Sequence, residues 1–153
     1  MGLIEAALEK QGIVLKYPDW TGKGAVFMRR SGKLLYLSAA LTGESGRAGV
    51  DTTTADLSRA GRALAFRVLG ELSDRLGTLD AIEYIAHVLV LVRSGGDYSD
   101  MPKAANGFSS ALVELLGDAG RHTRAAMGAP ELESGAMMLA EITLVLKDGT
   151  NAI

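Results

Sequence analysis

The sequence predicts an α+β domain in which two main helices cover one face of a mixed β-sheet. After a short N-terminal helix, β-rich and amphipathic segments follow in the order strand, strand, helix, strand, helix, strand, strand. The two longest strand candidates, residues 82–93 and 136–147, carry apolar residues on both of their faces. Helices gathered on one side of a sheet can cover only one of those faces. The second face therefore needs another cover, which indicates an oligomer.

Length and composition narrow the functional classes. The 153 residues are enough for one domain, which we expect to span residues 1–153, with residues 1–24 as a helix-and-loop extension. The absence of cysteine excludes disulfides and thiolate metal sites. Both charge signs are spread along the chain with a net charge of -2, so no basic stripe suits a nucleic acid. No apolar run approaches the ~20 residues that span a bilayer, and we expect a soluble, cytoplasmic protein without a membrane partner.

The first part of the chain predicts a short helix, a loop and a hairpin. Leu3, Ile4, Ala7 and Leu8 recur at helical spacing, and Gly12 ends that helix. Residues 17–24 read as a loop that contains Trp20, which we interpret as a packing anchor. The strand candidates 25–30 and 33–39 flank Ser31-Gly32, which is typical of a hairpin. The glycine-rich loop 42–49 is a surface loop or a mobile flap.

Two amphipathic segments predict the main helices. The first, residues 54–76, follows the candidate N-cap residues 51–54 and carries one apolar stripe. The stripe comprises Leu57, Ala60, Leu64, Val68, Leu72 and Leu76. The arginines away from it, Arg59, Arg62, Arg67 and Arg75, are expected to face solvent. The second helix covers residues 102–116, with Ala105, Phe108, Leu112 and Leu115 directed inward.

Strict alternation assigns the two faces of each long strand. In residues 82–93, one face holds Ile82, Tyr84, Ala86, Val88, Val90 and Val92, and the other holds Glu83, Ile85, His87, Leu89 and Leu91. In residues 136–147, one face is fully apolar and the other holds Met137, Leu139, Glu141, Thr143 and Val145. Leaving such mixed faces in water would expose several hundred Å² of apolar surface, which monomers seldom do.

The segment between the second main helix and the last strand candidate carries a recognisable motif. It reads Gly120-Arg121-His122-Thr123-Arg124-Ala125-Ala126-Met127-Gly128 and follows Asn106 to Gly117. Together with Gly32 to Ser38 and the turn Asp97 to Pro102, it resembles the Rid/YjgF family in its longer branch. These are the reactive-intermediate deaminases, also labelled endoribonuclease L-PSP. The resemblance covers about Val26 to Leu146.

The resemblance implies a fold, an assembly and a reaction. Members have a chorismate-mutase-like fold and form homotrimers with their sheets facing inward and a ligand cleft at each subunit boundary. By this likeness, Arg124 would grip the carboxylate of a 2-imino or 2-enamino acid, with the backbone at Ala126 helping to seat it. Arginine suits that role because its planar fork holds a carboxylate by two parallel bonds. Water then attacks the imine carbon and releases ammonia and a keto acid, without a metal or an organic cofactor.

Several positions depart from the family pattern. Ala25 stands where the family has a tyrosine on the first strand, and Ser38-Ala39 replaces the Ser-Gly after the second strand. Leu139 stands where the family has the glutamate that holds the attacking water. Glu141 lies two residues further on, on the same strand face as Leu139. The resemblance also matches Asn106 to a pocket-lining asparagine.

The remaining candidates each have two interpretations. His122 is a proton carrier or a solvent-exposed histidine. Glu141 is a catalyst or an ion-pair partner of an arginine such as Arg93, and Asn106 lines the pocket or caps the helix. We expect His87 to be partly buried at a subunit contact. With only two histidines and no paired ligands at metal spacing, no metal site is predicted.

Three functions follow from these observations. The chain is a cofactor-free deaminase or hydrolase of a small enamine or imine, or a non-enzymatic member that binds a small carboxylate metabolite. RNA cleavage is the third, and the net acidity and the lack of interleaved aromatic and basic residues disfavour it.

Overall fold

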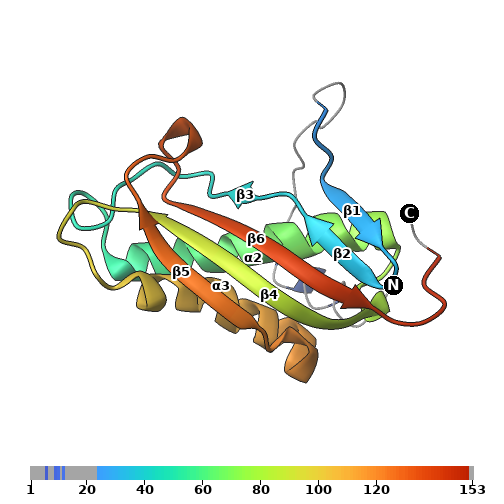
Figure 1. Ribbon diagram of the computed structural model, residues 1–153. Helices are drawn as coiled ribbons and strands as arrows, with labels where there is room; N and C mark the ends of the chain where they lie inside the picture. Colours follow the sequence, from blue (N-terminus) through green and yellow to red (C-terminus); the bar gives the residue numbers. More distant parts are fainter. Residues whose placement is uncertain (1–5, 7–8, 11, 13–23, 152–153) are drawn as a thin grey trace.

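Two helices cover one face of a mixed, six-stranded sheet in the computed structural model (Figure 1). The structure describes residues 24–151 together with Ala6, Glu9, Lys10 and Gly12. The predicted N-terminal helix and Trp20 therefore lie largely outside the described residues. The sheet order is β1-β2-β6-β4-β5, with β3 also paired to β6, and only β4 and β5 run parallel. The predicted α+β class and the element order are confirmed, with the two-residue strand β3 added.

The strands are β1 (Met28–Ser31), β2 (Leu34–Leu37), β3 (Ala40–Leu41), β4 (Ile82–Arg93), β5 (Thr123–Ala129) and β6 (Met138–Leu146). The helices are α2 (Thr54–Leu76) and α3 (Met101–Leu116), and the short 3-10 turns are η1 (Leu79–Ala81), η2 (Gly117–Gly120) and η3 (Glu133–Gly135). No helix in the described part of the chain is long and apolar enough to cross a membrane.

Helix α2 begins and ends where its sequence signals predict. The Thr53 hydroxyl accepts from the Asp56 amide while the Asp56 carboxylate accepts from the Thr53 amide, which is a capping box. At the other end, Gly77 adopts φ 80°, a left-handed conformation that favours glycine. All six residues of the predicted stripe are buried. The face of α2 that packs on the sheet and on α3 was therefore predictable from periodicity.

The hairpin turn lies one residue later than expected. Ser31 pairs with Leu34, so the turn consists of Gly32, at φ 60°, and Lys33. Strand β1 also begins only at Met28, and Ala25, expected on the first strand, precedes it as an exposed residue. The expectation for Ala25 was wrong because β-rich composition does not fix where strand pairing begins.

Strict alternation along β4 was wrong in its first half. The pairing of β4 with β6 shifts register between Ile82 and Tyr84 and again between Ile85 and His87. Each irregularity inserts a residue and reverses the faces that follow. Ile82 and Ile85 are consequently both buried, and Tyr84 is 46% exposed. From Val88 onward alternation holds, with Val88, Val90 and Val92 buried against the helices.

One further expectation needs correction, and one of two open interpretations is favoured. Arg67 does not lie on a solvated face: it is partly buried, burial lowers its pKa, and its guanidinium donates to the Leu41 carbonyl of β3. The loop 42–49 is tied to the sheet end, because the Thr42 hydroxyl accepts from the amides of Met137 and Met138, and Ala48 is fully buried. These contacts favour the interpretation of residues 42–49 as a surface loop over that of a mobile flap.

Candidate functional site

Arg124 lies on edge strand β5, with its guanidinium against the N-terminal half of α3. Its Nη1 donates to Asn106 Oδ1 at 3.1 Å and to Ser109 Oγ at 3.1 Å, and its Nη2 donates to the Pro102 carbonyl at 3.2 Å. All three acceptors are uncharged and belong to one helix. The helix therefore orients the guanidinium without neutralising it.

The guanidinium keeps capacity for a ligand. An arginine side chain has five N–H groups, and three of those of Arg124 are engaged. Within the described residues Arg124 has no carboxylate partner, whereas Arg47, Arg62 and Arg93 are ion-paired. A partly buried, uncompensated arginine with two unengaged N–H groups is suited to an anion.

His122 joins the same cluster from the residue before β5. Its Nε2 lies 2.9 Å from Ser109 Oγ, and its Nδ1 lies 2.6 Å from the Gly120 carbonyl. Burial lowers the pKa of His122, and the nearby charge of Arg124 adds to this effect. The structure thus brings three predicted residues together, Arg124, His122 and Asn106, around Ser109.

Ser109 and the Pro102 carbonyl were missed by sequence reasoning. Ser109 lies three residues after Asn106, so both project from one side of α3. That spacing was a usable signal once Asn106 had been selected. The role of the Pro102 carbonyl could not be predicted from the sequence, because a side chain does not indicate which backbone oxygens will lack a partner within the helix.

The other predicted residues lie elsewhere. Ala126 follows Arg124 on β5 and packs partly buried against the core. Ser38 and Ala39 come after β2, and the strands β6 and β4 separate them from β5, which carries Arg124. Strands are spaced about 4.8 Å apart, so the β3 position next to Ala39 and β5 are separated by roughly 14 Å. Within one chain, these two groups cannot grip the same small carboxylate.

Glu141 and Leu139 point away from Arg124. Val88 pairs with both Arg124 and Ile142, and directly paired residues share a face, here the helix-covered one. Leu89 pairs with both Ala125 and Glu141, and Leu91 with Leu139, on the helix-free face. The interpretation of Glu141 as the ion-pair partner of Arg93 is wrong, because the Arg93 guanidinium is 3.0 Å from Glu131 instead.

His87 also faces away from the helices. It is exposed within this single chain, so its expected burial at a subunit contact stays a prediction, and its Nδ1 lies 2.8 Å from Thr123 Oγ1. His87 pairs with Thr143 of β6, and Thr143 pairs in turn with Tyr36 of β2, so the three residues lie side by side across the sheet. Tyr36 and Met127, which share this helix-free face, are 48% and 52% exposed. The face therefore presents apolar side chains that this chain does not cover.

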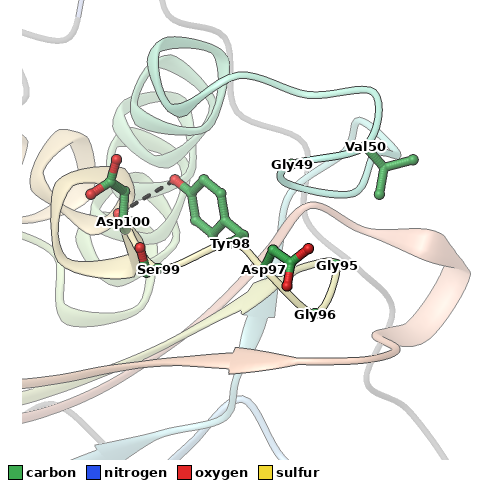
Figure 2. Close-up of a pocket in the computed structure, with 8 residues that line it drawn as sticks. All are labelled: Gly49, Val50, Gly95, Gly96, Asp97, Tyr98, Ser99 and Asp100. Carbon is green, nitrogen blue, oxygen red and sulfur yellow. Dashed lines mark hydrogen bonds between the residues drawn. The ribbon is translucent and has the colours of Figure 1, made fainter.

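A separate cleft of about 380 Å³ lies at the far end of β4, between Gly49-Val50 and the turn 95–100 (Figure 2). The Tyr98 hydroxyl lies 2.8 Å from Thr54 Oγ1, and the Tyr98 ring lies between Asp100 on one side and Asp97 on the other. None of the predicted site residues lines this cleft. In the residues that the structure describes, no group of three or more histidines or carboxylates is placed to hold a metal ion.

Comparison with known proteins relates the whole chain to one group. Protein TCP17 of Trypanosoma cruzi is 27% identical over 154 residues, covering 96% of both chains. Atu1372 from Agrobacterium tumefaciens, a solved structure of unknown function, is 27% identical with a TM-score of 0.84, covering 94% of this chain and 92% of that one. A "putative endoribonuclease" from Shewanella oneidensis is 24% identical with a TM-score of 0.84, covering 95% of this chain and 100% of its own.

No protein-family model matches the sequence. A further solved neighbour, a "putative endoribonuclease L-PSP" from Entamoeba histolytica, is 17% identical with a TM-score of 0.50, covering 80% of this chain and 88% of that one. The predicted fold, two helices on a mixed sheet in the chorismate-mutase-like arrangement, is confirmed, and the predicted resemblance to that family holds at the level of the fold.

Proposed function

We propose that this chain, whose solved structural neighbours are YjgF/L-PSP proteins, is a cofactor-free deaminase that hydrolyses a small enamine or imine of a 2-keto acid in the cytoplasm. The observation that carries the proposal is Arg124, a partly buried arginine held by three uncharged acceptors of α3. Its unengaged N–H groups suit a substrate carboxylate, and the substrate class follows from the resemblance of the surrounding motif.

The proposed reaction needs orientation more than activation. Water adds its oxygen to the imine carbon, the imine nitrogen takes up protons, and the C–N bond breaks to give a 2-keto acid and ammonia. A carboxylate fixed on Arg124 places the adjacent imine carbon at a constant distance from the protein, which lowers the entropic part of the barrier. His122 is the titratable group nearest to Arg124 in this cluster and is our candidate for proton transfer.

We further propose that the site is completed by a second copy in a homotrimer. Ser38, Ala39 and Ala25 lie at the opposite side of the sheet from Arg124, and Glu141 and Leu139 lie on its helix-free face. An association that covers the helix-free faces and also sets the β5 edge of one copy beside the β1–β3 edge of another would bring Ser38, Ala39 and Ala25 of one copy toward Arg124 of the next. The exposed apolar residues on that face support such an association.

A second candidate function is binding of a small carboxylate metabolite without catalysis. The specific observation in its favour is Leu139, an apolar side chain beside Leu41 and Leu91 at the position of the family's water-holding glutamate. Glu141, the nearest carboxylate along β6, is exposed and stands two residues away. In that case Arg124 would hold the ligand and no group would present water to it.

Ammonia release decides between the two functions. The substrate, 2-aminoacrylate, is generated enzymatically and its conversion to pyruvate and ammonia is followed with and without this protein, together with its longer homologues. The deaminase proposal expects release well above the spontaneous rate and loss of that increment in Arg124→Ala. Spontaneous rates with every homologue, together with measurable carboxylate binding, would establish the non-catalytic function. Incubation with RNA forms a parallel arm, in which we expect no cleavage.

A further inference from the structure

Ser109 occupies the junction between the two charged or titratable members of the site. Arg124 Nη1 can only donate, so Ser109 Oγ accepts this bond at 3.1 Å. The Gly120 carbonyl can only accept, so His122 Nδ1 carries the hydrogen of their 2.6 Å bond. The hydroxyl hydrogen of Ser109 is then directed to His122 Nε2, 2.9 Å away. The donor and the acceptor of each of these three hydrogen bonds are therefore assigned.

We propose that Ser109 is a positioning residue, whose hydroxyl supplies the donor that neutral His122 accepts at Nε2 and simultaneously fixes the guanidinium plane of Arg124. The part that concerns ligand binding rests on the function proposed above. Because one hydroxyl serves both neighbours, the protonation state of His122 and the orientation of the arginine fork are coupled. Asn106 and Pro102 hold the guanidinium but do not contact His122, so the coupling belongs to Ser109.

Protonation of His122 disrupts this arrangement in a defined way. The added hydrogen on Nε2 makes that nitrogen a donor, and Ser109 Oγ must then accept from two cationic groups. The Ser109 hydrogen loses its acceptor at the same moment. The Ser109 contact therefore stabilises neutral His122, in the same direction as the burial that lowers its pKa, whereas the Gly120 carbonyl acts in the opposite direction and raises it.

The charged groups around His122 also favour its neutral form. Arg124 on β5 and His87 on β4 both disfavour a positive imidazole. On the neighbouring η2 turn, Asp118 pairs with Arg121, and on α3 Glu114 pairs with Arg62. Within the described residues, no carboxylate is paired with His122.

The titration of His122 tests the proposal without any ligand. Nitrogen-15 NMR of the imidazole in the full-length protein should show Nδ1–H at pH 7.5 in the wild type. Ser109→Ala removes the donor to Nε2 while the Gly120 carbonyl still holds the hydrogen on Nδ1, so we expect the same tautomer and a higher titration midpoint. Ser109→Thr retains the hydroxyl and should restore the wild-type midpoint, and Ser110→Ala, one residue on and exposed, should match the wild type. An unchanged midpoint in Ser109→Ala would overturn the proposal.

Pyruvate binding tests whether Ser109 also positions the guanidinium of Arg124. Loss of one hydrogen bond to the guanidinium should weaken pyruvate binding by about three- to tenfold in Ser109→Ala, with recovery in Ser109→Thr. Equal affinity in Ser109→Ala and the wild type would show that Ser109 does not position Arg124. If the wild type binds no pyruvate, the proposed carboxylate function fails, and the NMR result still decides whether Ser109 controls His122.

Discussion

Gly107 of α3 packs directly on the backbone of Ser58 in α2. A Cβ atom at Gly107 would lie 1.7 Å from the Ser58 carbonyl oxygen and 2.5 Å from its carbon, so the two helices approach as closely as a glycine permits. Gly107 stands between Asn106 and Ser109, the two side chains that hold Arg124. The helix crossing and the position of the site residues therefore depend on the same glycine.

The first prediction concerns this contact. Gly107→Ala should lower the free energy of unfolding by about 1–3 kcal/mol or more, because two backbones must separate to admit the methyl group. Urea denaturation measures the change. The control is Gly43→Ala, whose Cβ would meet nothing within 4 Å. Equal stability of the two variants would contradict the close approach.

The second prediction concerns assembly. We expect light scattering to give about three times the 16.0 kDa chain mass at micromolar concentration. Met127→Lys should dissociate the assembly without unfolding the chain, because Met127 is 52% exposed on the helix-free face. Val50→Lys is the matched control, since Val50 is 69% exposed and lies outside the sheet. A monomeric wild type would refute the trimer and, with it, the proposal of a site shared between copies.

Much of this fold follows from the sequence because its signals are local. The capping box at Thr53, the apolar stripe of α2 and the run of β4, rich in apolar and β-branched residues, each specify an element independently of tertiary contacts. The register shifts near Tyr84 had no such signal, since they arise from pairing with β6. Arg67 was misassigned for a related reason: whether an arginine beside an apolar stripe meets water depends on the short strand β3 lying over it.

The candidate site was predictable only in part. Arg124, His122 and Asn106 lie close together as the motif indicated, because β5 runs beside the helix that precedes it. Glu141 was grouped with them by its place in the family pattern, but cross-strand pairing puts it on the other face of the sheet. Sequence alternation relates residues within one strand, and it cannot align two strands separated by a third.

The third prediction concerns pH. The pKa of His122 is lowered in the folded chain, chiefly by burial, so below about 6.5 the unfolded state binds more protons than the folded state. Stability should therefore fall as pH decreases from about 6.5 toward the folded pKa. His122→Asn should lose this part of the slope in unfolding curves measured between pH 5 and 8. An identical slope in the variant would show that other groups cause the dependence.

The fourth prediction concerns the missing glutamate. Leu139→Glu should raise imine hydrolysis if the absent carboxylate limits this protein, because it restores a group able to orient water. Ammonia release from 2-aminoacrylate measures the effect. Thr143→Glu adds the same charge to the same face of β6 and should leave the rate unchanged. A rate unaffected by Leu139→Glu, in a variant that folds and assembles as the wild type, would remove Leu139 as the explanation for altered activity.

The fifth prediction concerns Arg124 itself. Arg124→Ala should leave the fold intact, because its acceptors Asn106 and Pro102 are exposed and can bind water. Carboxylate binding should weaken by tenfold or much more, since each charge-assisted bond is worth ~1.5–3 kcal/mol. Arg124→Lys should fail nearly as badly, because a single ammonium cannot reach three acceptors on α3 and also present a fork to the ligand. Pyruvate titration and ammonia release measure both variants.

Arg121→Ala is the control for Arg124. Arg121 belongs to the same motif but is exposed, and its ion pair in the described part of the chain is with Asp118, so its loss removes an equal charge without touching the guanidinium cluster. If Arg121→Ala keeps wild-type pyruvate affinity and ammonia release while Arg124→Ala and Arg124→Lys lose them, the effect comes from the oriented guanidinium of Arg124 and not from positive charge in general. If Arg124→Ala instead lowers the melting temperature or dissociates the assembly, Arg124 is a structural strut at a subunit boundary. Full activity and full pyruvate affinity in Arg124→Ala would place the ligand site elsewhere in the molecule.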